Sequence, residues 1–150
     1  PEAEALGIEY VELDELMRRS DIVSLHVPNN ASTRGMIGKA QIDRMKPTAI
    51  LLNIGRGSAV DTEALCAALE SGRLGGAGLD VTDPEPLPPE HPLWDAPNAV
   101  ITPHISGFYH LRQTYERILE ICTENLAGFR EGRPLRNVVD EATGYRTLRE

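Results

Sequence analysis

Four short segments of the chain consist mostly of apolar residues, without the regular alternation of polar and apolar positions that marks a half-exposed strand. They lie near residues 21–27, 49–54, 76–81 and 99–102. Such runs are typical of strands buried on both faces of a parallel sheet. The clearest run, residues 49–54, leads into the turn Gly55-Arg56-Gly57, and we expect it to form the central strand.

Between these runs, apolar residues recur at helical spacing. The pattern predicts helices over residues 13–19, 39–45 and 61–72, with Asp61 as the N-cap of the third helix and Gly72 at its end. A short helix over residues 1–6 and a short strand over residues 8–11 are predicted before them. Strands and helices that alternate at this spacing predict βαβ units, and therefore an α/β fold with a parallel sheet.

Residues 82–98 interrupt this alternation. They contain six of the eleven prolines of the chain, together with Trp94, so they are predicted to form no regular structure. A loop of this length inside a compact domain usually has a function.

The last predicted element is a long amphipathic helix that ends at Gly132 and Pro134. Its apolar positions are Leu111, Tyr115, Ile118, Cys122, Leu126 and Phe129. We expect this face to pack in the core, although the same pattern suits a partner-binding surface. The tail after the helix has one strong apolar pair, Val138 and Val139, and is expected to pack on something outside this domain.

Composition narrows the possible functions. The 150 residues are 41% hydrophobic and 25% charged, as in a globular domain, and the net charge of −8 argues against a nucleic-acid or anionic-membrane partner. No signal peptide or membrane-spanning run is visible, so a cytoplasmic protein is expected. Cys66 and Cys122 lack metal-ligand spacing and are predicted to be small buried hydrophobes. Pro1 in place of an initiator methionine indicates a piece of a longer polypeptide.

Three residues of complementary chemistry follow predicted strands: Arg56, Glu85 and His104. The carboxyl ends of parallel strands meet at one edge of a sheet, where ligands bind. Arginine can hold a carboxylate through two hydrogen bonds, histidine can transfer a proton near neutral pH, and a glutamate beside it favours the imidazolium. The trio suits proton transfer to an oxygen next to a bound carboxylate. Read singly, Glu85 could be a turn residue and His104 a loop histidine.

Several motifs together give the chain a clear resemblance. They are residues 20–28 (Ser-Asp-Ile-Val-Ser-Leu-His-Val-Pro) with Thr33, residues 52–57 (Leu-Asn-Ile-Gly-Arg-Gly), residues 78–81 (Gly-Leu-Asp-Val), residues 84–86 (Pro-Glu-Pro), residues 91–94 (His-Pro-Leu-Trp) and residues 102–107 (Thr-Pro-His-Ile-Ser-Gly). In this order the chain resembles the second half of a D-isomer-specific 2-hydroxyacid dehydrogenase. The resemblance implies a Rossmann-like doubly wound parallel sheet, truncated at its N-terminal half. It also implies that residues 1–133 are the distal part of an NAD-binding domain, and that residues 134–150 return to a substrate domain absent from this chain.

The resemblance also implies roles for individual residues. Arg56 would bind the substrate carboxylate, His104 would act as general acid or base, and Glu85 would assist His104. Asp80 would accept a hydrogen bond from the nicotinamide carboxamide. The cofactor-binding residues would be His26, Pro28, Thr33, Asn53, Ile54, Gly55, Arg56, Asp80, His104 and Gly107. The cofactor would be NAD, with NADP not excluded, and no metal is expected.

The implied activity is hydride transfer between a nicotinamide cofactor and a small 2-hydroxy or 2-oxo acid, in an intact protein that is a homodimer. No G-x-G-x-x-G turn is present in the chain, so we expect the piece to be inactive alone. A non-catalytic NAD-sensing scaffold that resembles the C-terminal-binding corepressors is the alternative. The strand near residues 21–27 is apolar on both faces, so the isolated piece is also expected to self-associate through it.

Overall fold

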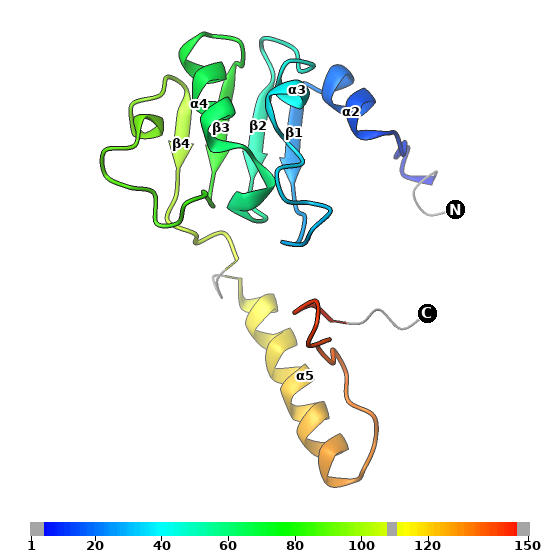
Figure 1. Cartoon of the computed structure of the whole chain (residues 1–150). Coiled ribbons are helices and arrows are strands. Elements are labelled where there is room, and N and C mark those ends of the chain that lie inside the picture. Colours follow the sequence, from blue (N-terminus) through cyan, green and yellow to red (C-terminus); the bar gives the residue numbers. More distant parts are fainter. Residues whose placement is uncertain (1–4, 108–110, 147–150) are drawn as a thin grey trace. The chain divides into compact units, whose positions relative to one another are not determined.

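The computed structural model describes residues 5–107 and 111–146. The chain divides into two compact units between Ser106 and Gly107, and the first unit contains the sheet while the second contains the long helix (Figure 1). In the described residues, no helix combines the length and the hydropathy that a bilayer crossing needs.

The first unit is built on a sheet of four parallel strands in the order β1-β2-β3-β4 (Figure 1). The strands are β1 (Ile22–Leu25), β2 (Ile50–Asn53), β3 (Gly76–Leu79) and β4 (Ala99–Ile101). The predicted parallel α/β fold is therefore confirmed, and it is Rossmann-like. Each strand is shorter than its apolar run, because the residues after its carboxyl end turn away from the sheet and form loops.

Helix α2 (Leu13–Arg19) precedes β1. Two further helices connect strands: α3 (Lys39–Ile42) lies between β1 and β2, and α4 (Thr62–Glu70) lies between β2 and β3. The N-cap of α4 is formed as predicted, since the Asp61 carboxylate accepts a hydrogen bond from the amide of Ala64 at 3.0 Å. Helix α3 ends at Ile42 rather than at residue 45, because the chain continues in turns toward Pro47.

The predicted strand over residues 8–11 is wrong. These residues are exposed or half-buried and have no regular structure, and β1 pairs with β2 alone among the described strands. Because no neighbouring strand pairs with residues 8–11, their backbone does not form the inter-strand hydrogen bonds of a sheet. The helix predicted over residues 1–6 lies largely outside the described residues.

The apolar core lies on one face of the sheet, between the strands and the helices. Its fully buried side chains are Met17, Ile37, Ile42, Met45, Leu51, Leu65, Leu69, Leu74 and Leu93. The opposite face remains open in the first unit: Ile22, Ile50 and Val100 are 58%, 40% and 65% exposed. The expectation that the strands are buried on both faces is therefore wrong for this unit, because the right-handed β-α-β connections place their helices on the same side. Self-association of the isolated piece stays a prediction.

The second unit consists of α5 (Arg112–Arg130) and the segment that returns beside it (Figure 1). The return is fixed by Asn125, whose side chain accepts from the Arg136 amide at 2.7 Å and donates to the Arg136 carbonyl at 3.0 Å. The Arg136 guanidinium also pairs with Glu124. These contacts are polar, so they leave the apolar positions of the helix uncovered.

The predicted packing of the apolar face of α5 is therefore not seen in the described residues. Leu111, Tyr115, Ile118, Leu126 and Phe129 are between 38% and 74% exposed. Cys122 is exposed as well, which corrects the prediction of a buried thiol, whereas Cys66 is buried as expected.

Candidate active site

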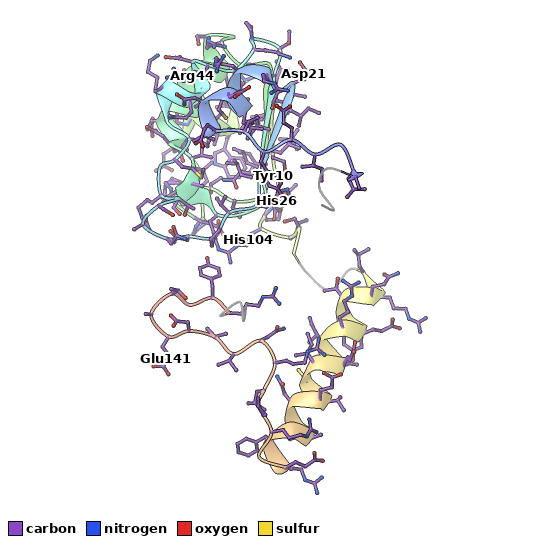
Figure 2. All side chains as sticks on the ribbon, turned by 90° about the vertical axis from the view of Figure 1, so that its right-hand side faces the viewer. Tyr10, Asp21, His26, Arg44, His104 and Glu141 are labelled. Atoms are coloured by element: carbon purple, nitrogen blue, oxygen red, sulfur yellow. The ribbon has the colours of Figure 1, made fainter. Side chains whose placement is uncertain are left out.

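The sequence-predicted residues of the first unit gather at the carboxyl ends of the strands. Residues 26–33 follow β1, Asn53 and the turn through Gly57 end β2, Asp80 follows β3, and residues 102–106 follow β4. Figure 2 shows His26 and His104 at one end of the unit, and Asp21 and Arg44 at the other. In open α/β sheets this edge is the ligand-binding edge. Gly107 lies in the second unit, and open space surrounds its α-carbon.

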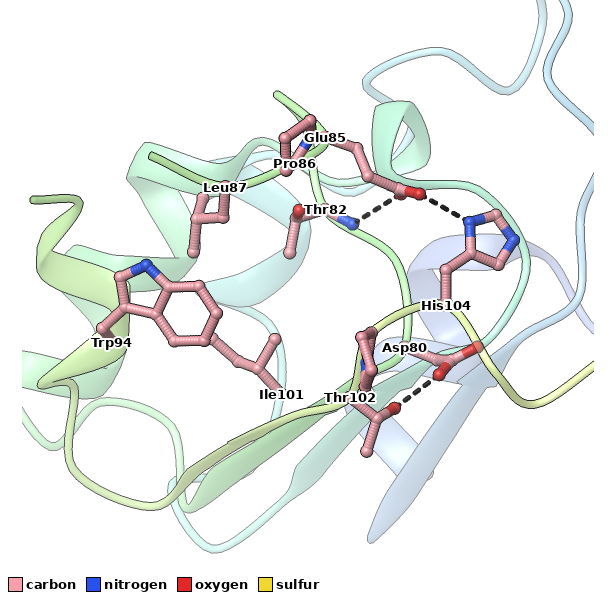
Figure 3. A pocket seen from close by; sticks show the side chains of 10 residues that line it. Asp80, Thr82, Glu85, Pro86, Leu87, Trp94, Ile101, Thr102 and His104 are labelled. Carbon is pink, nitrogen blue, oxygen red and sulfur yellow. Dashed lines mark hydrogen bonds and ion pairs between the residues drawn. The ribbon is translucent and has the colours of Figure 1, made fainter. Parts of the chain in front are cut away.

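The predicted contact between His104 and Glu85 is present. Nδ1 of His104 lies 2.6 Å from Oε1 of Glu85, and Oε2 of Glu85 accepts a longer hydrogen bond of 3.4 Å from the amide of Thr82 (Figure 3). Both side chains are a little under half exposed. A proton on Nδ1 satisfies this contact and leaves Nε2 of His104 free to exchange a proton with a bound molecule.

His104 has an unusual backbone conformation, with φ at 53°, in the left-handed region that costs a residue with a side chain about 1–3 kcal/mol. The turn that contains it is held by Asp80, which is 4% exposed. Oδ1 of Asp80 accepts from the Thr102 hydroxyl at 2.5 Å and from the Ile105 amide at 2.9 Å, and Oδ2 accepts from the Ser106 amide at 2.8 Å. The carboxylate is thus bonded on both sides of His104.

The environment of Asp80 also fixes its charge. Burial raises the pKa of this carboxyl, but hydrogen bonds from the side chains of Ser106 and Thr102 and from the amides of Ile105 and Ser106 outweigh burial. The net result is a pKa well below the ordinary value for aspartate, so the group is ionised throughout the neutral range.

A pocket of about 510 Å³ adjoins the His104–Glu85 pair (Figure 3). It is lined by the polar residues Asp80, Thr82, Glu85, Thr102 and His104 and by the apolar residues Pro86, Leu87, Trp94, Ile101 and Pro103. The indole of Trp94 is fixed by a hydrogen bond of 2.8 Å from Nε1 to the Pro88 carbonyl. The proline-rich segment thus forms one wall of the site.

Arg56 occupies a separate turn after β2. The buried side chain of Asn53 holds this turn, because it donates to the Arg56 carbonyl at 3.0 Å and accepts from the Gly55 amide at 3.1 Å. The exposed guanidinium of Arg56 donates to the Gly55 carbonyl at 2.7 Å and is not among the groups that line the pocket. Gly57 packs the turn directly against the loop that carries Glu85: a Cβ on Gly57 would lie 1.9 Å from the carbonyl oxygen of Thr82.

The remaining predicted cofactor residues line the ends of β1 and β2. Nε2 of His26 lies 2.9 Å from the Ser24 hydroxyl, and the Thr33 hydroxyl donates to the Pro28 carbonyl at 2.5 Å. Ile54 is 44% exposed at the end of β2. These groups fit a nicotinamide cofactor in part, since an exposed aliphatic side chain suits the apolar face of a ring. Each carboxylate oxygen of Asp80 already accepts a hydrogen bond from the chain, so a carboxamide N–H would share Asp80 with residues 102–106.

Three residues of the pocket lining are not predicted as site residues from the sequence: Thr82, Leu87 and Thr102. Each lies two residues from a predicted site residue, namely Asp80, Glu85 and His104 in turn, so this proximity is the available signal. Among the described residues, no group of three histidine, cysteine, aspartate or glutamate side chains could hold a metal ion.

The His104–Glu85 pair thus lies at the edge where Rossmann-like parallel sheets bind dinucleotides. Residues 1–106 match the family model described as "D-isomer specific 2-hydroxyacid dehydrogenase, NAD binding domain". The match covers more than half of the chain, and the chain belongs to this family.

Individual relatives agree with this assignment. The chain is 47% identical over 136 residues to a glyoxylate reductase from Korarchaeum cryptofilum, a match that covers 91% of this chain and 40% of that protein. It is 37% identical to the crystal structure of the D-isomer specific 2-hydroxyacid dehydrogenase of Lactobacillus delbrueckii ssp. bulgaricus in its NAD complexed form, with a TM-score of 0.81 over 93% of this chain and 45% of that one.

A third relative is a solved NADPH-dependent glyoxylate/hydroxypyruvate reductase from Sinorhizobium meliloti in complex with NADP and sulfate. It is 33% identical to this chain, with a TM-score of 0.76 over 89% of this chain and 42% of that one. The chain therefore spans about two-fifths of the length of the relatives that it matches.

Proposed function

We propose that the protein carrying this chain is an NAD(P)-dependent D-2-hydroxyacid dehydrogenase that reduces a small 2-oxo acid, with glyoxylate and hydroxypyruvate as the first candidates. The observation that carries the proposal is the contact of 2.6 Å between His104 and Glu85 beside a pocket at the carboxyl edge of the sheet. The names of the relatives support the substrate class, and their NAD and NADP complexes support a nicotinamide cofactor.

Each group of the chain has a task in this reaction. When bound, the cofactor supplies a hydride to C2 of the oxo acid. The guanidinium of Arg56 holds the substrate carboxylate through two charge-assisted hydrogen bonds. His104 donates a proton from Nε2 to the C2 oxygen as the hydroxyl forms, and it takes the proton back in the oxidation direction. Glu85 orients the ring and stabilises the imidazolium.

The domain assignment is part of the proposal. We assign residues 1–133 to the distal part of a coenzyme domain and residues 134–150 to a tail that returns to a substrate domain. Because the relatives are about two and a half times as long as the matched segment, the remaining parts of the site are expected from sequence outside this chain. The activity is therefore to be tested on the protein at its natural length, in which a homodimer is expected.

The test is NADH or NADPH oxidation with glyoxylate and with hydroxypyruvate, followed by chiral analysis of the product where the product is chiral. We expect turnover with at least one of the two acids and a D configuration. Glu85→Gln should lower kcat at least about tenfold, because it removes the charge that stabilises the imidazolium. Glu90→Gln, an exposed residue of the same loop, is the matched control and should leave kcat unchanged.

The result also separates the proposal from its alternative. Tight binding of NADH without turnover of any 2-oxo acid would contradict the enzyme proposal and favour a non-catalytic NAD-sensing scaffold. Turnover that is unaffected by Glu85→Gln would keep the activity but remove Glu85 from the mechanism.

A further inference from the structure

Asp80 is a buried charge that the proposed reaction does not use. It is one of two polar or charged side chains that are buried in the described residues, the other being Asn53. Removing a carboxylate from water is costly unless hydrogen bonds replace the lost hydration. Asp80 lies beside the pocket, at the end of β3, so the partners that replace this hydration show what the charge is for.

Among the described residues, the hydrogen bonds that the Asp80 carboxylate accepts come from one segment. The donors include the Thr102 hydroxyl, the Ile105 amide and the Ser106 amide, between 22 and 26 residues further along the chain. They bracket His104, with one donor two residues before it and two donors just after it. The carboxylate thus grips the backbone on both sides of the imidazole-bearing residue.

The backbone conformation of His104 requires hydrogen bonds of this kind to hold it. With φ at 53°, it occupies a conformation that a residue with a side chain adopts only when its surroundings hold it there. The same conformation places Nδ1 of His104 at 2.6 Å from Glu85. If the turn relaxed, the imidazole would lose its direction toward Glu85 while the rest of the sheet remained unchanged.

We infer that Asp80 is the positioning residue of His104: its carboxylate clamps residues 102–106 in the turn that aims the imidazole. This inference rests on the proposed function, since the imidazole is aimed for proton transfer. It is independent of the role that family resemblance implies for Asp80, which is a hydrogen bond to the carboxamide of the cofactor.

The first experiment compares Asp80→Asn with wild type in the protein at its natural length. The asparagine keeps the size of the side chain but turns one acceptor into a donor, which then faces a donor of the loop. We expect the amides of Ile105 and Ser106 to exchange hydrogen at least about tenfold faster in the absence of cofactor. We also expect kcat to fall about 100-fold, as for a small misplacement of a catalytic group.

The matched control is Asp61→Asn, at the N-cap of α4, where a carboxylate also accepts a backbone hydrogen bond. The asparagine oxygen can still accept that bond, so Asp61→Asn should change neither stability by much nor the exchange of the Ile105 and Ser106 amides. If Asp80→Asn fails to fold, Thr102→Val removes one donor of the clamp at constant shape and should shift exchange and kcat in the same direction. Unchanged amide exchange in both Asp80→Asn and Thr102→Val would overturn the inference.

A cofactor analogue separates the clamp from a contact between Asp80 and the carboxamide of the cofactor. Reduced acetylpyridine adenine dinucleotide lacks the N–H donors of the carboxamide but still carries a transferable hydride. We expect Asp80→Asn to lower kcat by a similar factor with NADH and with the analogue, because the clamp acts on His104. A loss of kcat with NADH that is absent with the analogue would show that Asp80 acts through the carboxamide, which contradicts the inference.

A double-variant cycle tests whether Asp80 acts through His104. If it does, Asp80→Asn should lower kcat little or not at all in a His104→Gln background, because the group being positioned is already gone. Fully additive losses would overturn the inference. Absence of turnover in wild type would instead overturn the proposed function, while the amide exchange would still decide the clamp.

Discussion

His104 and Arg56 occupy neighbouring loops at the same edge of the sheet, but the chain holds them in different ways. His104 is fixed at its side chain by Glu85 and at its backbone by Asp80. At Arg56 the turn is fixed by Asn53, while the guanidinium is exposed and bonds only to the adjacent Gly55 carbonyl among the described residues. The residue that we propose as the proton donor is thus fixed in place, whereas the residue that we propose to bind the carboxylate can adjust to its ligand.

The largest effect is expected at His104, the residue that the chain holds in place. His104→Gln should lower kcat about 1000-fold, because no general acid remains to protonate the C2 oxygen, and should change the Kd for NADH less than threefold. Steady-state kinetics and fluorescence titration on the protein at its natural length measure the two quantities.

His91→Gln is the matched control for that variant. His91 is buried to about nine-tenths at its side chain and faces Glu63 at 3.4 Å, away from the pocket lining. Replacing His91 should leave kcat unchanged. A His104 variant that retains more than about a tenth of the wild-type kcat would show that another group supplies the proton.

The next largest effect is expected at Arg56, whose guanidinium can adjust to a ligand. Arg56→Lys keeps the charge but loses the planar pair of donors, so we expect KM for the oxo acid to rise about tenfold, and about 100-fold for Arg56→Ala. Arg18→Ala, on the exposed side of α2, is the control. If KM stayed constant in both Arg56 variants, carboxylate binding would have to be assigned to another residue.

Asn53→Ala should show that the Arg56 turn depends on a buried amide. It removes two hydrogen bonds at a fully buried side chain, so we expect a loss of about 1–3 kcal/mol in the free energy of unfolding. Urea denaturation measures the loss. We expect Asn53→Ala to change the KM for the oxo acid by a larger factor than the exchange rates of the Ile105 and Ser106 amides. A larger change in the exchange rates would contradict the comparison.

The smallest effect is the pH dependence of the clamp. The pKa of Asp80 is lowered by folding, so its contribution to stability is complete above the unfolded value of about 3.9 and is lost as the pH falls toward the folded value. In urea denaturation, the stability difference between wild type and Asp80→Asn should be constant from about pH 6 to 8 and should narrow below about pH 4. A difference that stayed constant in acid would show that Asp80 is not held as an ion.

Most helices and strands, and the His104–Glu85 pair, could be predicted from local patterns. The hydrogen-bond partners of buried groups could not. Asp61 lies just before a helical pattern, and its cap forms as the position indicates. Glu85 and His104 follow predicted strands, and parallel strands bring such positions together. The clamp around Asp80 depends on donors 22 to 26 residues away, for which the sequence carries no spacing rule.

The uncovered apolar surfaces show a second limit. Ile22 and Phe129 lie in apolar patterns that indicate burial, yet they are 58% and 74% exposed. An apolar residue indicates that exposure to water is unfavourable at its position, but it does not indicate which segment covers it. The pattern therefore predicts the element and its apolar side, while the covering surface has to come from the structure.

The close packing of Gly57 against Thr82 has a consequence for how this site can change. The turn that carries Arg56 and the loop that carries Glu85 touch through main-chain atoms, so no side chain between them can be enlarged or trimmed to adjust their spacing. Substitutions that alter substrate preference must then act elsewhere, for instance at Leu87 or Trp94 in the pocket wall. Directed evolution of the protein should therefore tolerate variation in the pocket wall while it retains glycine at position 57.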